Sequence, residues 1–254
     1  MTKLTKNKTV RGLLLELAEP EYADFVAKGA PSDYPVLGVR VPKLQEIAND
    51  IFKSGTADEF LASLEPRSRE EVHLRSLVLA LKIEKEGISV YKDELFEQIL
   101  KMDSWEMVDA ICSRLKSIKK HREEWLILID EMLETNRKIR EDRGENGEYF
   151  VRTGLVLLLN YYVEADWIQV VFERILKVIN REEYYIKMAI AWLIQKCYVS
   201  YPDLTFSFLK TNAMPDFVLR KAVSKIQDSY RVDEEWKMKA KNLIRRENVA
   251  CTEK

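Results

Sequence analysis

The chain has 254 residues, of which 33% are charged and 46% are hydrophobic, and its formal net charge is −1. This composition is ordinary for a soluble globular protein and excludes disorder over most of the chain. The near-zero charge is less than most nucleic-acid-binding proteins carry, because phosphate binding usually requires an excess of basic residues. Three widely spaced cysteines and two histidines suit neither a disulfide scaffold nor a zinc site.

The N-terminal residues, Met1–Lys6, are polar and basic, and no apolar signal segment follows them. No run in the sequence approaches the ~18 consecutive apolar residues of a membrane span. We therefore expect a cytoplasmic protein without a membrane-spanning segment.

Few glycines and prolines separate long runs of Leu, Ile, Lys and Glu, which favours an almost wholly helical protein without a β-sheet. Helix starts are predicted where a capping residue lies three positions before a glutamate. They are Thr56–Glu59, Ser68–Glu71, Asp103–Glu106 and Asn180–Glu183. Apolar residues recur between them at helical spacing, and we expect about thirteen helices, or roughly six antiparallel pairs.

Two segments are predicted to be irregular, Gly29–Pro35 and the charged stretch Asn136–Gly147, which we expect to form a mobile loop. The first helix, Thr9–Leu17, and the last helix, Glu234–Arg246, are expected to cap the array with a polar face each. Residues 248–254 are expected to be a disordered tail. Because no internal boundary is evident, residues 1–254 are predicted to form a single domain and to act as a monomer.

Internal similarity favours stacked helix pairs. The segment Leu74–Leu81 resembles Val151–Leu158, and Leu219–Val223 repeats its opening. Each segment is interpreted as a buried helix that begins with an arginine, and the apolar helix of each pair is expected to be sandwiched between its neighbours. The predicted fold is an all-α solenoid, curved around a concave groove.

Four residues are candidates for a functional site. Trp105 and Asp109 are four residues apart and would share one face of a helix. Arg152 follows Asp109 by 43 residues, and Trp192 follows Arg152 by 40 residues. In helix pairs of about that period, these positions would line one surface, which would suit a cationic, flat-faced ligand. Purely structural interpretations stay open. Both indoles could be packing residues, and Arg152 could serve only to neutralise Asp109 in a structural ion pair.

Five short segments together carry a family resemblance. They are Gly38–Leu44, Ser104–Asp109, Arg152, Lys187–Trp192 and Arg220–Ala222. In order and spacing they resemble the AlkD-type DNA alkylation-repair glycosylases over roughly residues 10 to 230. The resemblance implies HEAT-like helical repeats that hold duplex DNA in a concave groove. It also implies hydrolysis of the N-glycosidic bond of N3- or N7-alkylated purines, without a metal or an organic cofactor.

The same resemblance implies roles for the four candidates. Asp109 matches the family's catalytic carboxylate, which would stabilise the oxocarbenium-like sugar and orient the attacking water. Trp105 and Trp192 match the aromatic pair that packs against the deoxyribose and backbone around the lesion. Arg152 matches an arginine of the same cleft, where it would grip a phosphate. The family is unusual in working without flipping the base into a closed pocket.

Six basic residues are expected to contact double-stranded DNA: Arg40, Lys43, Lys187, Lys196, Arg220 and Lys221. Two positions depart from the family, because Met188 replaces a lysine and Gln195 replaces an arginine. These departures favour one alternative, a non-catalytic DNA-binding relative. The near-neutral charge favours another, a helical-repeat scaffold that binds a peptide or protein. The two histidines, His73 and His121, are interpreted as incidental.

Overall fold

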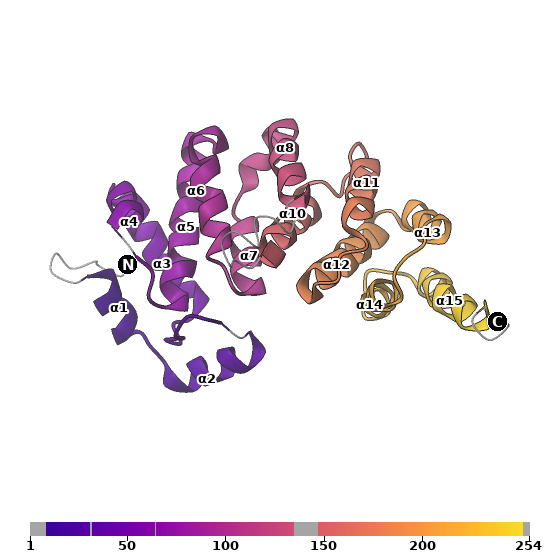
Figure 1. Ribbon diagram of the computed structural model, residues 1–254, viewed down its shortest axis with the longest axis horizontal. Helices are drawn as coiled ribbons and strands as arrows, with labels where there is room; N and C mark the ends of the chain where they lie inside the picture. Colours follow the sequence, from indigo (N-terminus) through magenta and orange to yellow (C-terminus); the bar gives the residue numbers. More distant parts are fainter. Residues whose placement is uncertain (1–8, 31, 64, 135–146, 251–254) are drawn as a thin grey trace. The chain divides into compact units, whose positions relative to one another are not determined.

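The computed structural model describes residues 9–30, 32–63, 65–134 and 147–250. Within these ranges it contains fourteen α-helices, one short 3-10 helix and no β-strand (Figure 1). The prediction of an all-helical protein built from packed helix pairs is therefore confirmed. The number of described helices is close to the number that the caps and breaks predicted.

The chain divides into two compact units. Unit 1 comprises residues 1–125 and 137–150, and unit 2 comprises residues 126–136 and 151–254. The division falls within two helices, α8 (Arg122–Glu134) and α10 (Gly147–Tyr161). The expectation of one domain over residues 1–254 stays a prediction.

Unit 1 is built around one long helix, α5, which packs against α3, α4, α6 and α7. The bounds of its elements are α1 (Val10–Glu16), α2 (Pro20–Gly29), α3 (Val41–Lys53), α4 (Ala57–Ser63), α5 (Arg69–Glu86), α6 (Ile88–Leu100), α7 (Trp105–Cys112) and η1 (Lys116–Lys120). Because apolar residues occur all round α5, Leu74, Leu77 and Leu79 are all fully buried. The predicted sandwiching is confirmed for this helix.

Unit 2 is built around α12, which packs against α13 and α14, while α14 also packs against α15. The bounds of the helices are α11 (Ile168–Val178), α12 (Tyr184–Ser200), α13 (Pro202–Thr211), α14 (Asp216–Gln227) and α15 (Glu234–Ala250). Ile190, Leu193 and Ile194 of α12 are fully buried, so α12 is sandwiched in the same way as α5. The tail predicted from residue 248 onward begins inside α15, which extends to Ala250.

The cap at Ser68 is confirmed. The Ser68 hydroxyl accepts a hydrogen bond from the Glu71 N–H at 3.3 Å, and the Glu71 carboxylate accepts one from the Ser68 N–H at 3.1 Å. This reciprocal pair satisfies two backbone donors at the start of α5. Thr56 likewise immediately precedes α4, as predicted.

The cap predicted at Asp103 is wrong. α7 begins at Trp105, and Ser104 is its N-cap residue. The Asp103 carboxylate instead accepts hydrogen bonds from the Ser32 hydroxyl and the Asp33 N–H, each at 2.6 Å. Donors some seventy residues earlier in the sequence therefore bind the carboxylate oxygen that would cap the helix in a local capping pattern.

The cap predicted at Asn180 is also wrong, because α12 begins at Tyr184 after Glu183. The N–H of Arg181 donates to the carbonyl of Val178 at 3.0 Å, so this segment forms the turn that ends α11. The predicted break at Gly29–Pro35 is found between α2 and α3. Of the charged stretch 136–147, only Gly147 lies inside the described residues, at the start of α10.

The prediction that the three repeated arginines begin their helices is wrong. Arg75, Arg152 and Arg220 lie in the second turns of α5, α10 and α14, since each helix begins four to six residues earlier. Each helix instead begins at Arg69, Gly147 or Asp216, residues that lie before the segments whose similarity was the basis of the prediction.

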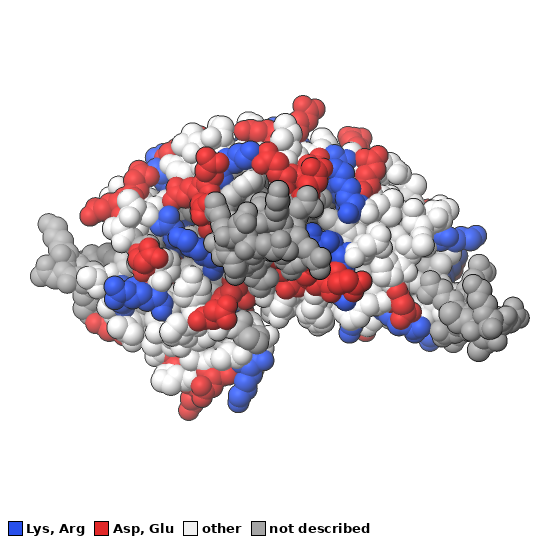
Figure 2. Space-filling model, viewed as in Figure 1, with Lys and Arg blue, Asp and Glu red and all other residues white. Residues whose placement is uncertain are grey.

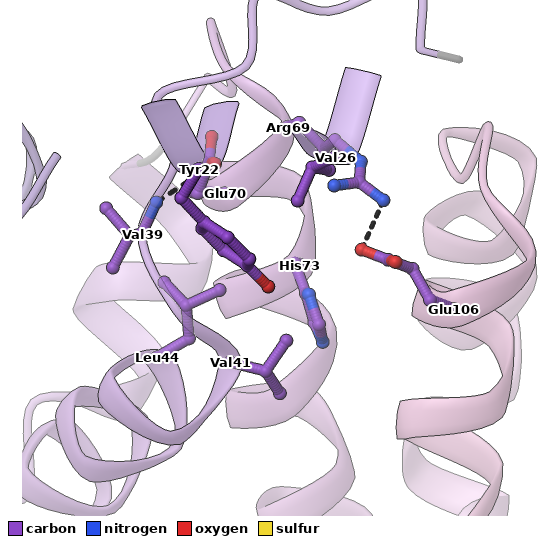
Figure 3. Close-up of a pocket in the computed structure, with 9 residues that line it drawn as sticks. All are labelled: Tyr22, Val26, Val39, Val41, Leu44, Arg69, Glu70, His73 and Glu106. Carbon is purple, nitrogen blue, oxygen red and sulfur yellow. Dashed lines mark hydrogen bonds and ion pairs between the residues drawn. The ribbon is translucent and has the colours of Figure 1, made fainter. Parts of the chain in front are cut away.

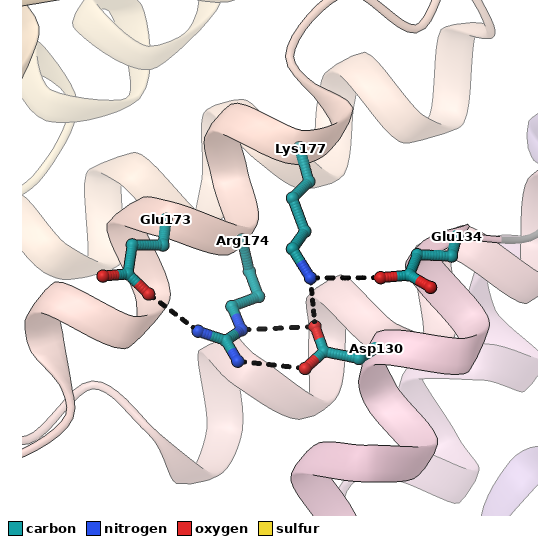
Figure 4. Close-up of polar contacts among 5 residues, drawn as sticks. All are labelled: Asp130, Glu134, Glu173, Arg174 and Lys177. Atoms are coloured by element: carbon teal, nitrogen blue, oxygen red, sulfur yellow. Dashed lines mark hydrogen bonds and ion pairs between the residues drawn. The ribbon is translucent and has the colours of Figure 1, made fainter.

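A polar network joins α8 to α11 within unit 2 (Figure 4). The Asp130 carboxylate accepts hydrogen bonds from Arg174 Nη2 at 2.9 Å and from Lys177 Nζ at 3.0 Å. Lys177 also reaches Glu134 at 3.2 Å, and Arg174 reaches Glu173 at 2.9 Å. Burial alone would raise the pKa of Asp130, but the bonds from the two cations outweigh it and hold that pKa below its ordinary value.

On the face drawn in Figure 2, acidic and basic side chains are interspersed, as a formal net charge of −1 would suggest. In the part of the chain that the structure describes, no helix combines the length and the apolar character needed to cross a membrane.

Candidate functional site

The short helix α7 of unit 1 carries the first two candidates. Its buried face consists of Met107, Val108, Ile111 and Cys112. Trp105, the first residue of α7, is 38% exposed, and Asp109 one turn later is half-buried. The helix therefore presents an indole and a carboxylate on its accessible side, as their spacing predicted.

The start of α7 is held by Arg69, the first residue of α5. Arg69 Nη2 donates to the Ser104 hydroxyl at 2.9 Å and also forms an ion pair with the carboxylate of Glu106. Arg69 is only 4% exposed. A cation buried this deeply requires such partners, because an unpaired charge is costly away from water.

A small pocket lies beside this contact (Figure 3). It is lined by residues of α2, α3, α5 and α7, and Figure 3 shows Arg69 and Glu106 pointing toward each other at one side. About 10 Å³ of it is open to the centre of a water molecule, which is room for about one water. The pocket is therefore too small to receive a purine base.

Glu70 and His73 line the same pocket from α5. The Glu70 carboxylate accepts hydrogen bonds from the N–H groups of Leu37 and Gly38, at 3.0 and 2.8 Å. His73 is 3% exposed, and burial, together with nearby Arg69 and Arg114, lowers its pKa to about 4. Its imidazole is therefore neutral at neutral pH.

The other two candidates belong to unit 2. Arg152 of α10 is 5% exposed, and its Nη1 donates to the carbonyl of Tyr185, in the first turn of α12, at 3.3 Å. Trp192 of α12 is half-buried, so it is not a fully buried core residue. Met188 lies one turn before Trp192 and Gln195 one turn after it, and both are half-buried. These three residues share one face of α12.

Three of the predicted DNA-contacting residues gather where α12 and α14 begin. Lys187 Nζ lies 5.0 Å and Lys221 Nζ 5.8 Å from the ring centre of Phe217. Lys187 also pairs with Glu182 at 3.3 Å, and Arg220 pairs with Asp216 at 2.7 Å. The structure thus brings Lys187 and Lys221 to one aromatic ring.

Lys196 lies apart from that cluster, half-buried one turn after Trp192 on α12. In unit 1, Arg40 is the N-cap residue of α3 and pairs with Glu19 at 2.8 Å. This hydrogen-bonded pair lowers the pKa of Glu19. Lys43 in the first turn of α3 pairs with Glu46 at 2.9 Å.

The four candidates thus divide between the units, with Trp105 and Asp109 in unit 1 and Arg152 and Trp192 in unit 2. The group around Arg69 was not predicted from the sequence, and His73 was interpreted as incidental. The sequence feature that could have indicated this group is the cluster of charged residues at the start of α5, a helix that is otherwise apolar. No group of three or more potential metal ligands occurs in the described ranges.

The architecture defines a helical-repeat protein that presents an indole and a carboxylate on a short accessible helix. Residues 10–226 match the family model described as DNA alkylation repair enzyme. The chain belongs to this family, which implies DNA as its partner and the repair of alkylated bases as its role. A comparison with curated proteins gave no match.

Proposed function

We propose that the protein is a DNA glycosylase that hydrolyses the N-glycosidic bond of N3- or N7-alkylated purines in duplex DNA. The observation that carries this proposal is the half-buried carboxylate of Asp109 one turn from the exposed indole of Trp105. Both residues, together with Arg152 and Trp192, lie inside the matched residues 10–226.

The chemistry suits these residue types. An alkylated purine already carries a positive charge, so it can leave without being protonated. The developing positive charge on the sugar is stabilised by the Asp109 carboxylate, which also orients or deprotonates the attacking water. The faces of Trp105 and Trp192 favour neighbouring cationic character by about 0.5–2 kcal/mol.

The geometry supports a different role for Arg152 from the phosphate contact expected from the family resemblance. Its low exposure leaves little of the guanidinium accessible to a phosphate, and Nη1 already donates to the Tyr185 carbonyl. We assign Arg152 to holding the first turn of α12, the helix that carries Trp192.

The test is release of free base from duplex DNA carrying 7-methylguanine, corrected for spontaneous depurination in the absence of protein. The natural protein should release base well above this background, and Asp109→Asn should not, although it should bind the duplex equally well. Asp58→Asn is the control, because it removes an exposed carboxylate in the same unit that pairs with Lys82 of α5. Full activity of Asp109→Asn would remove Asp109 from the mechanism.

A second candidate is a DNA-binding protein of the same family without glycosylase activity. It is favoured by Met188 and Gln195, since the face of α12 that carries Trp192 has two uncharged residues where the family resemblance implies cations. Salt-dependent binding of duplex DNA without release of base, by both the natural protein and Asp109→Asn, would identify it.

A further inference from the structure

Arg69 contacts the residue that precedes Trp105 in the sequence and the residue that follows it. Ser104, which precedes Trp105, is 1% exposed, and its hydroxyl lies 2.9 Å from Arg69 Nη2. Glu106, which follows Trp105, forms an ion pair with the same guanidinium (Figure 3). A single buried cation on α5 therefore fixes the two neighbours of an exposed indole on α7.

The start of α7 depends on this contact more than most helix starts would. Ser104 is the N-cap residue, but its side chain makes no capping hydrogen bond to α7. With only eight residues, α7 is too short to be stable without tertiary contacts. Asp103, the residue before Ser104, accepts hydrogen bonds from Ser32 and Asp33.

We propose that Arg69 is a positioning residue that sets the orientation of the first turn of α7, and thereby of Trp105 and Asp109. Arg69 acts through Ser104 and Glu106 and is not itself a catalytic residue. Its effect on base release rests on the function proposed above, whereas its effect on the orientation of Trp105 does not.

The test variant is Arg69→Met, which keeps most of the side-chain volume and removes the donors. Base release should slow by about 10- to 100-fold in single-turnover measurements, as expected when a reacting group is displaced by about 1 Å. The Kd for undamaged duplex should change less than about twofold, because no predicted DNA contact is removed. Arg69→Lys restores the charge without the planar fork, so it should recover part of the rate.

Arg75→Met is the matched control. Arg75 lies on the same helix and is similarly buried, with a side chain 13% exposed that pairs with Glu94 of α6 at 2.9 Å. It also donates to the carbonyl of Leu61, so among the described residues its hydrogen bonds run to α4 and α6 rather than to α7. Arg75→Met should therefore lose stability as Arg69→Met does, while keeping its single-turnover rate within about twofold.

A spectroscopic readout separates orientation from activity. The five tryptophans can be labelled with 5-fluorotryptophan, and the Trp105 signal assigned with Trp105→Phe. The fluorine resonance of Trp105 should shift or broaden in Arg69→Met and stay unchanged in Arg75→Met. If Arg69→Met does not fold, Ser104→Ala and Glu106→Ala, which each remove one of the two contacts, serve in its place.

An unchanged Trp105 resonance in a folded Arg69→Met protein would overturn the proposal, as would an equal loss of rate in Arg75→Met. If the resonance moves but even the natural protein releases no base, the glycosylase function is wrong and the positioning of α7 by Arg69 stands.

Discussion

Replacing His73 tests how unit 1 responds to acid. The pKa of His73 is lowered from 6.5 to about 4 by burial, with Arg69 and Arg114 as the nearby cations. Between these two pH values the unfolded chain binds a proton that the folded protein does not, so stability falls as the pH falls. At about 1.36 kcal/mol per pKa unit, the loss attributable to His73 reaches about 3 kcal/mol. Above pH 6.5 it vanishes, and below about pH 4 it stops growing.

The assay is thermal unfolding between pH 7 and pH 4, comparing the natural protein with His73→Gln. Subtracting the two curves cancels carboxylates that titrate in the same range. The natural protein should lose roughly 6–12 °C of Tm more than His73→Gln does over this range. His121→Gln is the matched control, since His121 is the other histidine in the chain and is exposed.

Two results would refute this reasoning. One is a pH dependence of Tm that is the same in His73→Gln and in the natural protein. The other is an NMR titration in which the His73 ring titrates near 6.5 in the folded protein. Because the chain has two histidines, His121→Gln also assigns the resonances.

Gly38→Ala should destabilise unit 1 by more than about 3 kcal/mol, because Gly38 has a φ of +84° and a Cβ there would lie 2.2 Å from the carbonyl oxygen of Glu19. Gly55→Ala, at a φ of +77° with open space around it, should cost only about 1–2 kcal/mol in urea unfolding; equal losses would show that the clash is relieved. Arg152→Ala should leave the slope of log Kd for duplex DNA against log salt unchanged, whereas a slope lower by about one would show that Arg152 binds a phosphate.

Local patterns predicted the helices well where their physical basis was local. The capping box at Ser68 and Glu71 needs only neighbouring residues, and it formed as expected. At Asp103 the same pattern failed, because Ser32 and Asp33 took its carboxylate. The periodicity of apolar residues likewise placed α5, but it could not show which distant segments its first turn would bind.

The candidate site likewise has features that depend on local geometry and features that depend on distant contacts. The spacing of Trp105 and Asp109 was sufficient to place them on one helix face, because it depends on helical geometry alone. The role of Arg69 was not readable, since its partners lie 35 and 37 residues away. His73 was set aside because its low pKa arises from burial and from cations that only the folded chain brings near.

Four of the cations expected to contact DNA already carry a counterion of their own, supplied by the protein. These pairs are Arg40–Glu19, Lys43–Glu46, Lys187–Glu182 and Arg220–Asp216. A phosphate that binds such a cation must displace the carboxylate paired with it. The freed carboxylate then attracts a cation from solution, while the DNA phosphate releases a cation into solution. The favourable entropy of ion release is thereby partly cancelled at each contact. The protein should hold DNA more weakly, and lose less affinity on added salt, than its number of phosphate contacts implies, which favours short residence on undamaged DNA.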